Sequence, residues 1–140
     1  MKMRLATKKE LKKHLPNDPV RPHIKTDWRT TFGREVYVLE NTGEVQAVIC
    51  IAYTDDIPKS EKDMNSPGLD VAVMYTVWSY KKGAGRELVL QALNMLKASK
   101  PMVTRYVTLS PLTDTATRFH QRNGALNIGI HKDCQNFEYY

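Results

Sequence analysis

Cysteine and long apolar runs are both scarce in this sequence of 140 residues. The two cysteines, Cys50 and Cys134, lack the spacing of metal ligands, so we expect two free thiols in a reducing compartment and no metal. No signal peptide is visible, because the basic N-terminal segment 1–15 has no apolar core. The longest apolar stretch, 45–53, is too short and too interrupted to span a membrane. These absences predict a cytoplasmic protein with no membrane partner.

Positive charge is in excess, while the rest of the composition is ordinary. The chain is 41% hydrophobic and 26% charged, with a net charge of +6. This predicts one domain over residues 1–140, in which 1–22 form an N-terminal helix and connector. The charge suits an anionic partner such as nucleic acid, a membrane surface or a phosphorylated small molecule. We interpret the basic residues within 2–13 as solvated surface, whereas the cluster within 81–86 adjoins glycines and is interpreted as functional.

Hydrophobic periodicity and turn signals predict the order of the elements. In chain order, we expect a helix at 8–14, a connector at 16–22, helical turns at 27–32, strands at 34–40 and 45–53, a loop at 54–69, a strand at 70–77, a helix at 85–99, a strand at 104–109, a turn at 110–112, a helix at 113–123 and short strands at 125–131 and 137–140. Because a helix connects strands 70–77 and 104–109, these two should be parallel. The predicted fold class is α/β (α+β), with a mixed, mostly antiparallel sheet that has one central parallel pair and is flanked by helices.

The turn between strand 70–77 and helix 85–99 carries the first chemical signal. Unpaired amides at a helix N-terminus attract anions, and glycines let a phosphate approach the backbone closely. The residues expected to bind phosphate are Lys81, Lys82, Gly83, Ala84, Gly85 and Arg86. The turn lacks the GK[ST] ending of a P-loop and the third glycine of a dinucleotide fingerprint. The alternative is a glycine turn that serves chain geometry alone.

Two motifs resemble those of the GNAT acyltransferase superfamily. Tyr80-x-x-Gly83-x-Gly85 is similar to [Q/R]-x-x-G-x-[G/A], whose loop amides bind the pyrophosphate of coenzyme A in that family. Tyr80 departs from the usual Gln or Arg, which affects a side-chain role but not the backbone cradle. In the later motif, 116–125, His120 stands where most members have a tyrosine that protonates the departing thiolate.

The resemblance also implies where the cofactor lies. Strands 70–77 and 104–109 should splay at their C-terminal ends, so that the pantetheine arm enters between them and an N–H within 76–78 polarises the thioester carbonyl. The further residues expected at the cofactor are Tyr75, Thr76, Val77 and Phe119, with Trp78 and Tyr80 as additional candidates. Core packing explains the ring of Tyr75 equally well.

Within the superfamily, the sequence is most similar to the catalytic domain of malonyl-CoA decarboxylase. The similarity is carried by Thr108-Leu-Ser110-Pro111, by 118–125 and by 52–58 (Ala-Tyr-Thr-Asp-Asp-Ile-Pro). It implies that Ser110 and His120 act on the malonyl carboxylate and the resulting enolate. The family's N-terminal helical domain and its long helical insertion between the serine and histidine motifs have no counterpart in this sequence.

Each candidate catalytic residue has a plainer interpretation. Ser110 precedes a proline and could be a turn serine that bonds local backbone. His120 could pack at a helix end, although histidine also titrates in the range that thioester chemistry requires. Asp55 and Asp56 could serve an amine substrate as general base, but a charged loop is favoured. Cys134 has no base at a fixed spacing, so a nucleophilic thiol is not expected.

Three functions follow from these residues. The first is an acyltransferase that moves an acyl group from acetyl-CoA to an amine on a small molecule or a protein. The second is a decarboxylase that acts on malonyl-CoA or a related acyl-CoA. The third is a nucleic-acid-binding module, which is disfavoured because no helix-turn-helix, zinc or RNP signature is present. A homodimer is the remaining partner considered.

Overall fold

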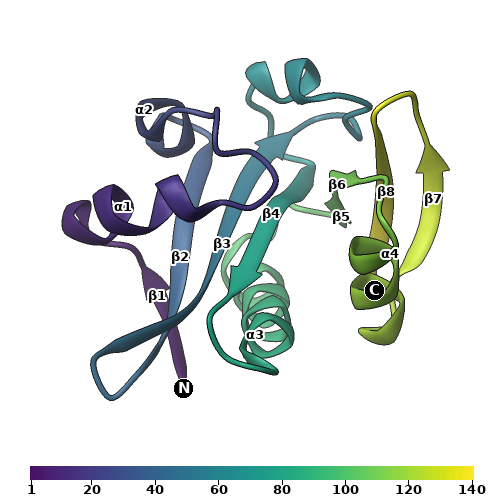
Figure 1. Cartoon of the computed structure of the whole chain (residues 1–140). Coiled ribbons are helices and arrows are strands. Elements are labelled where there is room, and N and C mark those ends of the chain that lie inside the picture. The colour runs from purple at the N-terminus through teal and green to yellow at the C-terminus, as the bar shows by residue number, and fades with distance from the viewer.

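A computed structural model describes all residues 1–140 and shows a mixed eight-stranded sheet covered by helices on both faces (Figure 1). The elements are β1 (Lys2–Leu5), α1 (Lys8–His14), the 3-10 helix η1 (Leu15–Asn17), α2 (Thr26–Thr30), β2 (Arg34–Asn41), β3 (Glu44–Thr54), the 3-10 helix η2 (Glu61–Asn65), β4 (Val71–Ser79), α3 (Ala84–Ser99), β5 (Arg105–Thr108), β6 (Ser110–Pro111), α4 (Asp114–Arg122), β7 (Leu126–Ile130) and β8 (Cys134–Tyr139). No helix combines the length and the apolar character that crossing a membrane requires.

The sheet has the strand order β1-β2-β3-β4-β5-β8-β6, with β7 paired to β8. Only β4 and β5 run parallel, and every other pair is antiparallel. The predicted fold class, a mostly antiparallel sheet with one central parallel pair, is therefore confirmed.

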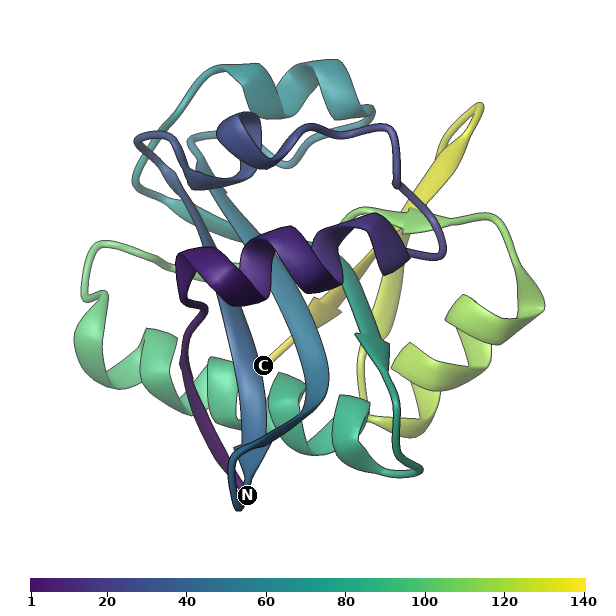
Figure 2. The same cartoon turned by 60° about the vertical axis from the view of Figure 1, so that its left-hand side comes forward.

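Alternating side chains of the central strands feed a separate apolar core on each face of the sheet. On one face, Leu88, Ala92 and Leu96 of α3 pack against residues such as Ile49 of β3. On the other face, a second core that includes Val73 lies beneath α1, η1 and α2. Figure 2 shows α1 crossing the front of the sheet while α3 runs behind it. Burial on both faces explains why β3 and β4 are apolar almost without interruption.

The central parallel pair parts halfway along β4. Strand β4 pairs with β5 only as far as Met74, which lies opposite Thr108. Directly after that point the register with β3 shifts, so that Tyr75 is an extra residue in a β-bulge. From Tyr75 to Ser79, the edge of β4 that would face β5 has no strand partner. The splay implied by the family resemblance is present, and it opens a gap in the sheet.

Several elements differ from the sequence prediction, among them β8, which begins at Cys134 instead of residue 137. Strand β1 was missed, because four mixed residues carry no periodicity and become a strand only by pairing with β2. The loop predicted at 54–69 contains η2, and β4 continues to Ser79 through part of the predicted connector. The predicted turn at 110–112 begins as β6, because Ser110 pairs with Gln135 of β8. For β1 and β6, pairing with a strand distant in the sequence overrides the local signal.

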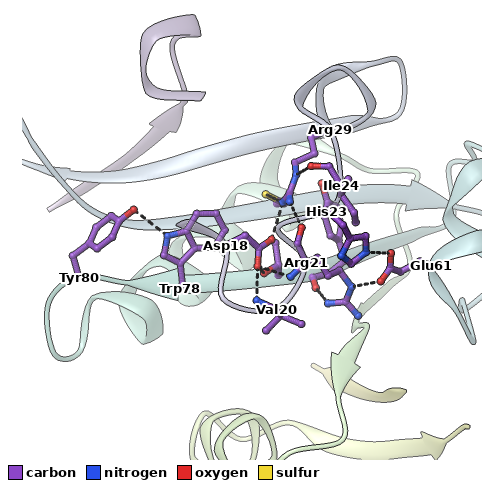
Figure 3. Close-up of polar contacts among 12 residues, drawn as sticks. Asp18, Val20, Arg21, His23, Ile24, Arg29, Glu61, Trp78 and Tyr80 are labelled. Carbon is purple, nitrogen blue, oxygen red and sulfur yellow. Dashed lines mark hydrogen bonds and ion pairs between the residues drawn. The ribbon is translucent and has the colours of Figure 1, made fainter. Parts of the chain in front are cut away.

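The proline-rich connector is tied to the sheet by a buried ion pair (Figure 3). Nη1 of Arg29 lies 2.9 Å from Oδ2 of Asp18, and both side chains are fully buried. Oδ1 of Asp18 accepts hydrogen bonds from the N–H groups of Val20 and Arg21 and from the hydroxyl of Thr76 on β4. A segment that was expected to be a plain connector is therefore a structural part of the sheet face.

We expect the substitution Asp18→Ala to destabilise the fold strongly, because it leaves the Arg29 guanidinium buried without a counter-charge. The expected loss in the free energy of unfolding is about 3–5 kcal/mol, measured by urea denaturation. The matched control is Glu40→Gln, which weakens the partly exposed Arg4–Glu40 pair (2.8 Å). That change should cost less than about 1 kcal/mol. Equal losses in the two variants would contradict the importance of the buried pair.

Candidate active site

A cavity of about 580 Å³ occupies the gap beside the unpaired end of β4. Its wall is built from β4, the start of α3, β6, one side of α4 and the connector after η1. Seven of the residues predicted for the site line it: Tyr75, Thr76, Val77, Gly85, Ser110, Phe119 and His120. The topology thus brings together residues from four separate stretches of the sequence.

The glycine turn lies at the mouth of this cavity and leaves main-chain donors free. Gly83 has a φ of +82°, a conformation that L side chains rarely adopt, and directly precedes α3. The N–H groups of Lys82, Gly83, Gly85 and Arg86 form no hydrogen bond within the chain. Gly85 lines the cavity, and a Cβ placed there would lie 3.5 Å from the ring of Phe119. The turn offers the free amides expected of a phosphate site.

The basic side chains around the turn are not equivalent. Nη1 of Arg86 donates to the carbonyl oxygen of Arg122 at 3.1 Å, so this side chain joins α3 to the end of α4. Nζ of Lys81 lies 3.9 Å from Glu44, whereas Lys82 forms no ion pair. Lys81, Lys82 and Arg86 lie outside the cavity wall, as do the predicted residues Gly83 and Ala84. Lys82 is therefore the free cation nearest to the unpaired amides.

Tyr80 turns away from the cavity, and Figure 3 shows its hydroxyl against the indole of Trp78. The hydroxyl oxygen accepts from Nε1 of Trp78 and from Nδ2 of Asn17, each at 3.1 Å. Both lone pairs are then occupied, so its proton is directed at Nδ1 of His14, 2.9 Å away. Trp78 itself lines the cavity. The tyrosine that replaces the usual Gln or Arg thus links the turn to η1 by a hydrogen bond.

His120 is buried in an aromatic environment at the inner end of α4. Its ring lies 5.0 Å from that of Phe119 and 5.2 Å from that of Phe137, measured between centroids. Nδ1 is 2.7 Å from the hydroxyl of Tyr139, while Nε2 has no partner within the chain. Burial lowers the pKa of His120 to about 4. The imidazole is therefore neutral at pH 7, with one nitrogen held by Tyr139 and the other free.

Ser110 lines the same cavity from β6 and is also buried. Its hydroxyl donates to Oγ1 of Thr108 at 2.8 Å, and the same Oγ1 accepts from the N–H of Phe137 at 3.0 Å. The hydroxyl oxygen of Ser110 remains free to accept a hydrogen bond. This environment differs from that of an exposed turn serine, because the side chain belongs to a buried network that links β5, β6 and β8.

The ring of Tyr75 belongs to the core on the far face of the sheet. It packs edge-on against Trp28 at 5.6 Å between centroids, and its hydroxyl has no partner. Burial raises the pKa of Tyr75 far above its ordinary value. Its carbonyl oxygen, at the bulge, accepts a hydrogen bond from Nη1 of Arg21. Tyr75 therefore contributes core packing through its ring, as the alternative interpretation held, and an anchored carbonyl through its backbone.

Other candidates lie away from this cavity. Asp55 and Asp56 line a different hollow of about 640 Å³ beneath the loop that carries η2. Cys134 donates its thiol to the carbonyl oxygen of Lys59 at 3.0 Å, and burial raises its pKa, so the reactive thiolate is disfavoured. The cavity wall itself contains no aspartate or glutamate.

Sequence reasoning missed two residues of this site. Arg21 lies in the proline-rich connector and lines the cavity, and Tyr139 in the last strand holds His120. Neither has a local signal, because a charged residue between prolines and a tyrosine in a short terminal strand are ordinary features. Only the folding of both ends of the chain toward the end of β4 reveals them.

Comparisons with known proteins place this geometry in a fold family. No family model matches the sequence, and no curated protein matches it. A malonyl-CoA decarboxylase from Agrobacterium vitis is similar in structure, with a TM-score of 0.69 at 18% identity over 84% of this chain. The match covers 35% of the decarboxylase, so this chain spans about a third of its length.

Smaller solved structures match over nearly their whole length. An acetyltransferase from Bacillus subtilis in complex with CoA has a TM-score of 0.64 at 17% identity, over 98% of this chain and 94% of that one. An acetyltransferase of the GNAT family from Streptococcus pneumoniae has a TM-score of 0.63 at 8% identity, over 99% and 98%. The chain therefore has the GNAT fold, which these acetyltransferases share with part of malonyl-CoA decarboxylase.

Proposed function

We propose that this chain binds an acyl-coenzyme A thioester and transfers its acyl group to a nucleophile, of which an amine is the first candidate. The observation that carries the proposal is the group of unbonded amides of Lys82, Gly83, Gly85 and Arg86 beside a cavity in the gap of the sheet. A diphosphate at these amides would meet the positive end of the α3 dipole and the side chain of Lys82. The similarity to an acetyltransferase in complex with CoA supports coenzyme A as the ligand.

The cavity suits the rest of the cofactor. Gly85 lies in the cavity wall against Phe119, and a Cβ there would already be in van der Waals contact with the ring. The pantetheine arm would run along the unpaired edge of β4, which offers main-chain groups in place of the missing strand. The thioester would then lie near the bulge, between β4 on one side and the Ser110 and His120 side chains on the other.

His120 is the group in this cavity that is suited to move a proton. In the neutral tautomer whose Nδ1–H donates to the hydroxyl oxygen of Tyr139, the free Nε2 is able to accept a proton from an attacking amine. The departing thiolate is negatively charged and stabilises the imidazolium, so the same nitrogen then returns the proton to sulfur. With no carboxylate in the wall, His120 serves as both base and acid, and Tyr139 is a positioning residue that fixes the orientation of the ring.

A second candidate function is decarboxylation of malonyl-CoA, and one specific observation favours it. Ser110 and His120 line one cavity from different elements, as the motif similarity to malonyl-CoA decarboxylase implies. In this reaction the bond between the carboxylate and the α-carbon breaks, CO₂ leaves, and the electron pair forms an enolate. A proton delivered to the α-carbon then gives acetyl-CoA.

Coenzyme A should stabilise the folded protein, because a ligand that binds only the native state shifts unfolding by mass action. At about 100 times the dissociation constant, the gain is about 2.7 kcal/mol, or roughly 5–10 °C in Tm for a chain of this size. Thermal-shift measurements with CoA, acetyl-CoA and malonyl-CoA test this. No shift and no heat in calorimetry with any of the three would overturn the proposal.

The charge reversal Lys82→Glu should weaken CoA binding, because the free cation nearest to the amides becomes an anion. The expected loss is about three- to tenfold for a partly screened charge. Lys132→Glu, in the turn between β7 and β8, makes the same change of net charge far from the cavity and is the matched control. If both variants weaken CoA binding equally, the effect comes from the net charge of the protein and not from a phosphate site at the turn.

His120→Gln should lower kcat by about 10²–10⁴-fold while CoA affinity changes little, since the histidine moves a proton and does not hold the cofactor. Release of free thiol measures the rate. Tyr139→Phe removes the hydroxyl that orients the ring and should have a smaller effect. An unchanged kcat in His120→Gln would remove His120 from the mechanism.

In wild type, the ring protons of His120 should keep constant NMR shifts from pH 8 to pH 5 and change only near pH 4, because burial opposes protonation.

Incubation with malonyl-CoA distinguishes the two candidate reactions. If the chain is a decarboxylase, mass spectrometry will show acetyl-CoA formed without any added acceptor, and Ser110→Ala will lower that rate by removing a contact to the departing carboxylate. If it is a transferase alone, malonyl-CoA remains intact until an amine is supplied. Thr115→Ala, at a cavity position that neither mechanism uses, is the control.

A further inference from the structure

Arg21 is a buried arginine in the cavity wall whose hydrogen bonds are incomplete. Only 5% of its side chain is exposed. Nη1 donates to the carbonyl oxygen of Tyr75 at the bulge, which fixes the guanidinium beside the point where β4 and β5 part. Figure 3 shows the side chain extending from the connector toward Glu61.

Most donors of this guanidinium have no acceptor in the chain. A guanidinium carries five N–H donors. Nε is fully buried and forms no hydrogen bond, and Nη2 has no partner within the chain. Arginine retains its charge at pH 7 because its ordinary pKa lies so far above it, even though burial lowers the pKa of Arg21. A buried cation with free donors is costly unless an acceptor completes it.

Glu61 balances part of this charge but does not complete the hydrogen bonds. Its Oε2 lies 3.3 Å from Nε of Arg21, an ion pair without hydrogen-bond geometry. Its other oxygen lies 2.8 Å from Nε2 of His23, and 42% of the Glu61 side chain is exposed. Glu61 is therefore an outer counter-charge on η2 and is absent from the cavity wall. Nη2 and the second N–H of Nη1 are therefore without an acceptor, in a residue that lines the cavity.

The chemistry of the wall indicates which ligand would complete Arg21. It contains no carboxylate, so an ammonium group has no partner there, whereas a carboxylate has a planar guanidinium that matches its two oxygens. Arg21 is bonded to the backbone of the strand segment beside which the proposed thioester lies. A carboxylate at the far end of a short acyl group would reach this position.

We propose that Arg21 is a specificity-determining residue that binds a carboxylate on the acyl group, so that the site takes dicarboxylic acyl thioesters in preference to simple acyl thioesters. This inference rests on the proposed coenzyme A site. It adds a residue that neither motif contains, and it names the charge of the acyl group. The carboxylate accepts hydrogen bonds from the free N–H groups of Arg21, and Ser110 lines the same space.

The test compares two unreactive thioethers of equal length, S-(2-carboxyethyl)-CoA and S-propyl-CoA, by calorimetry with the intact chain. Wild type should bind the carboxylate-bearing thioether at least roughly tenfold more tightly, as expected for a charge-assisted, partly buried pair. Arg21→Met should abolish that preference while its affinity for S-propyl-CoA stays within about threefold of wild type. Arg21→Lys, which keeps the charge but not the fork, should restore part of the preference.

Glu61→Gln is the second arm, because it removes the competing counter-charge without touching the cavity wall. It should increase the preference for the carboxylate-bearing thioether by about two- to fivefold. This arm and the wild-type preference remain decisive if Arg21→Met does not fold. Equal binding of the two thioethers by wild type, or a preference that survives in folded Arg21→Met, overturns the role of Arg21 and leaves the coenzyme A site intact. Absence of binding by both thioethers and by free CoA overturns the proposed function itself.

Discussion

One buried carboxylate, that of Asp18, holds the site together. It pairs with Arg29 and accepts hydrogen bonds from two connector amides and from the hydroxyl of Thr76, next to the bulge of β4. Because these partners come from the connector, α2 and the sheet, the carboxylate fastens an otherwise irregular segment to the strand that carries the cavity. The position of Arg21 follows directly, since its own N–H is one of the groups that Asp18 binds.

Burial acts in opposite ways on the two ionisable side chains of the cavity. His120 is surrounded by aromatic rings without a counter-charge, and therefore stays neutral at pH 7. Arg21 is equally buried but keeps its charge, because no accessible pH deprotonates a guanidinium and Glu61 stands nearby. The cavity thus combines a neutral proton carrier with a fixed positive charge. This combination suits the chemistry of an acyl group that is itself an anion.

The mixed sheet and the glycine turn were predictable because their causes are local. The capping box at Thr7, the apolar stripe of α3 and the stop at Gly124 each depend on neighbours within a turn or two. Strand β1 and the network of Ser110 were not predictable in this way, because each depends on residues far along the chain. Tyr80 was predictable only in part, because its departure from the motif was evident in the sequence, whereas its hydrogen bond to η1 was not.

By itself, the sequence determined the order of the longer helices and strands, the one parallel strand pair and the residues of the two motifs, since these depend on periodicity, turn chemistry and spacing. The tertiary structure alone decided that β4 outruns β5 and opens a cavity, that His120 is neutral, and that Arg21 joins the wall. Desolvation and the pairing of buried charges act between residues distant in the chain, so no local pattern records them.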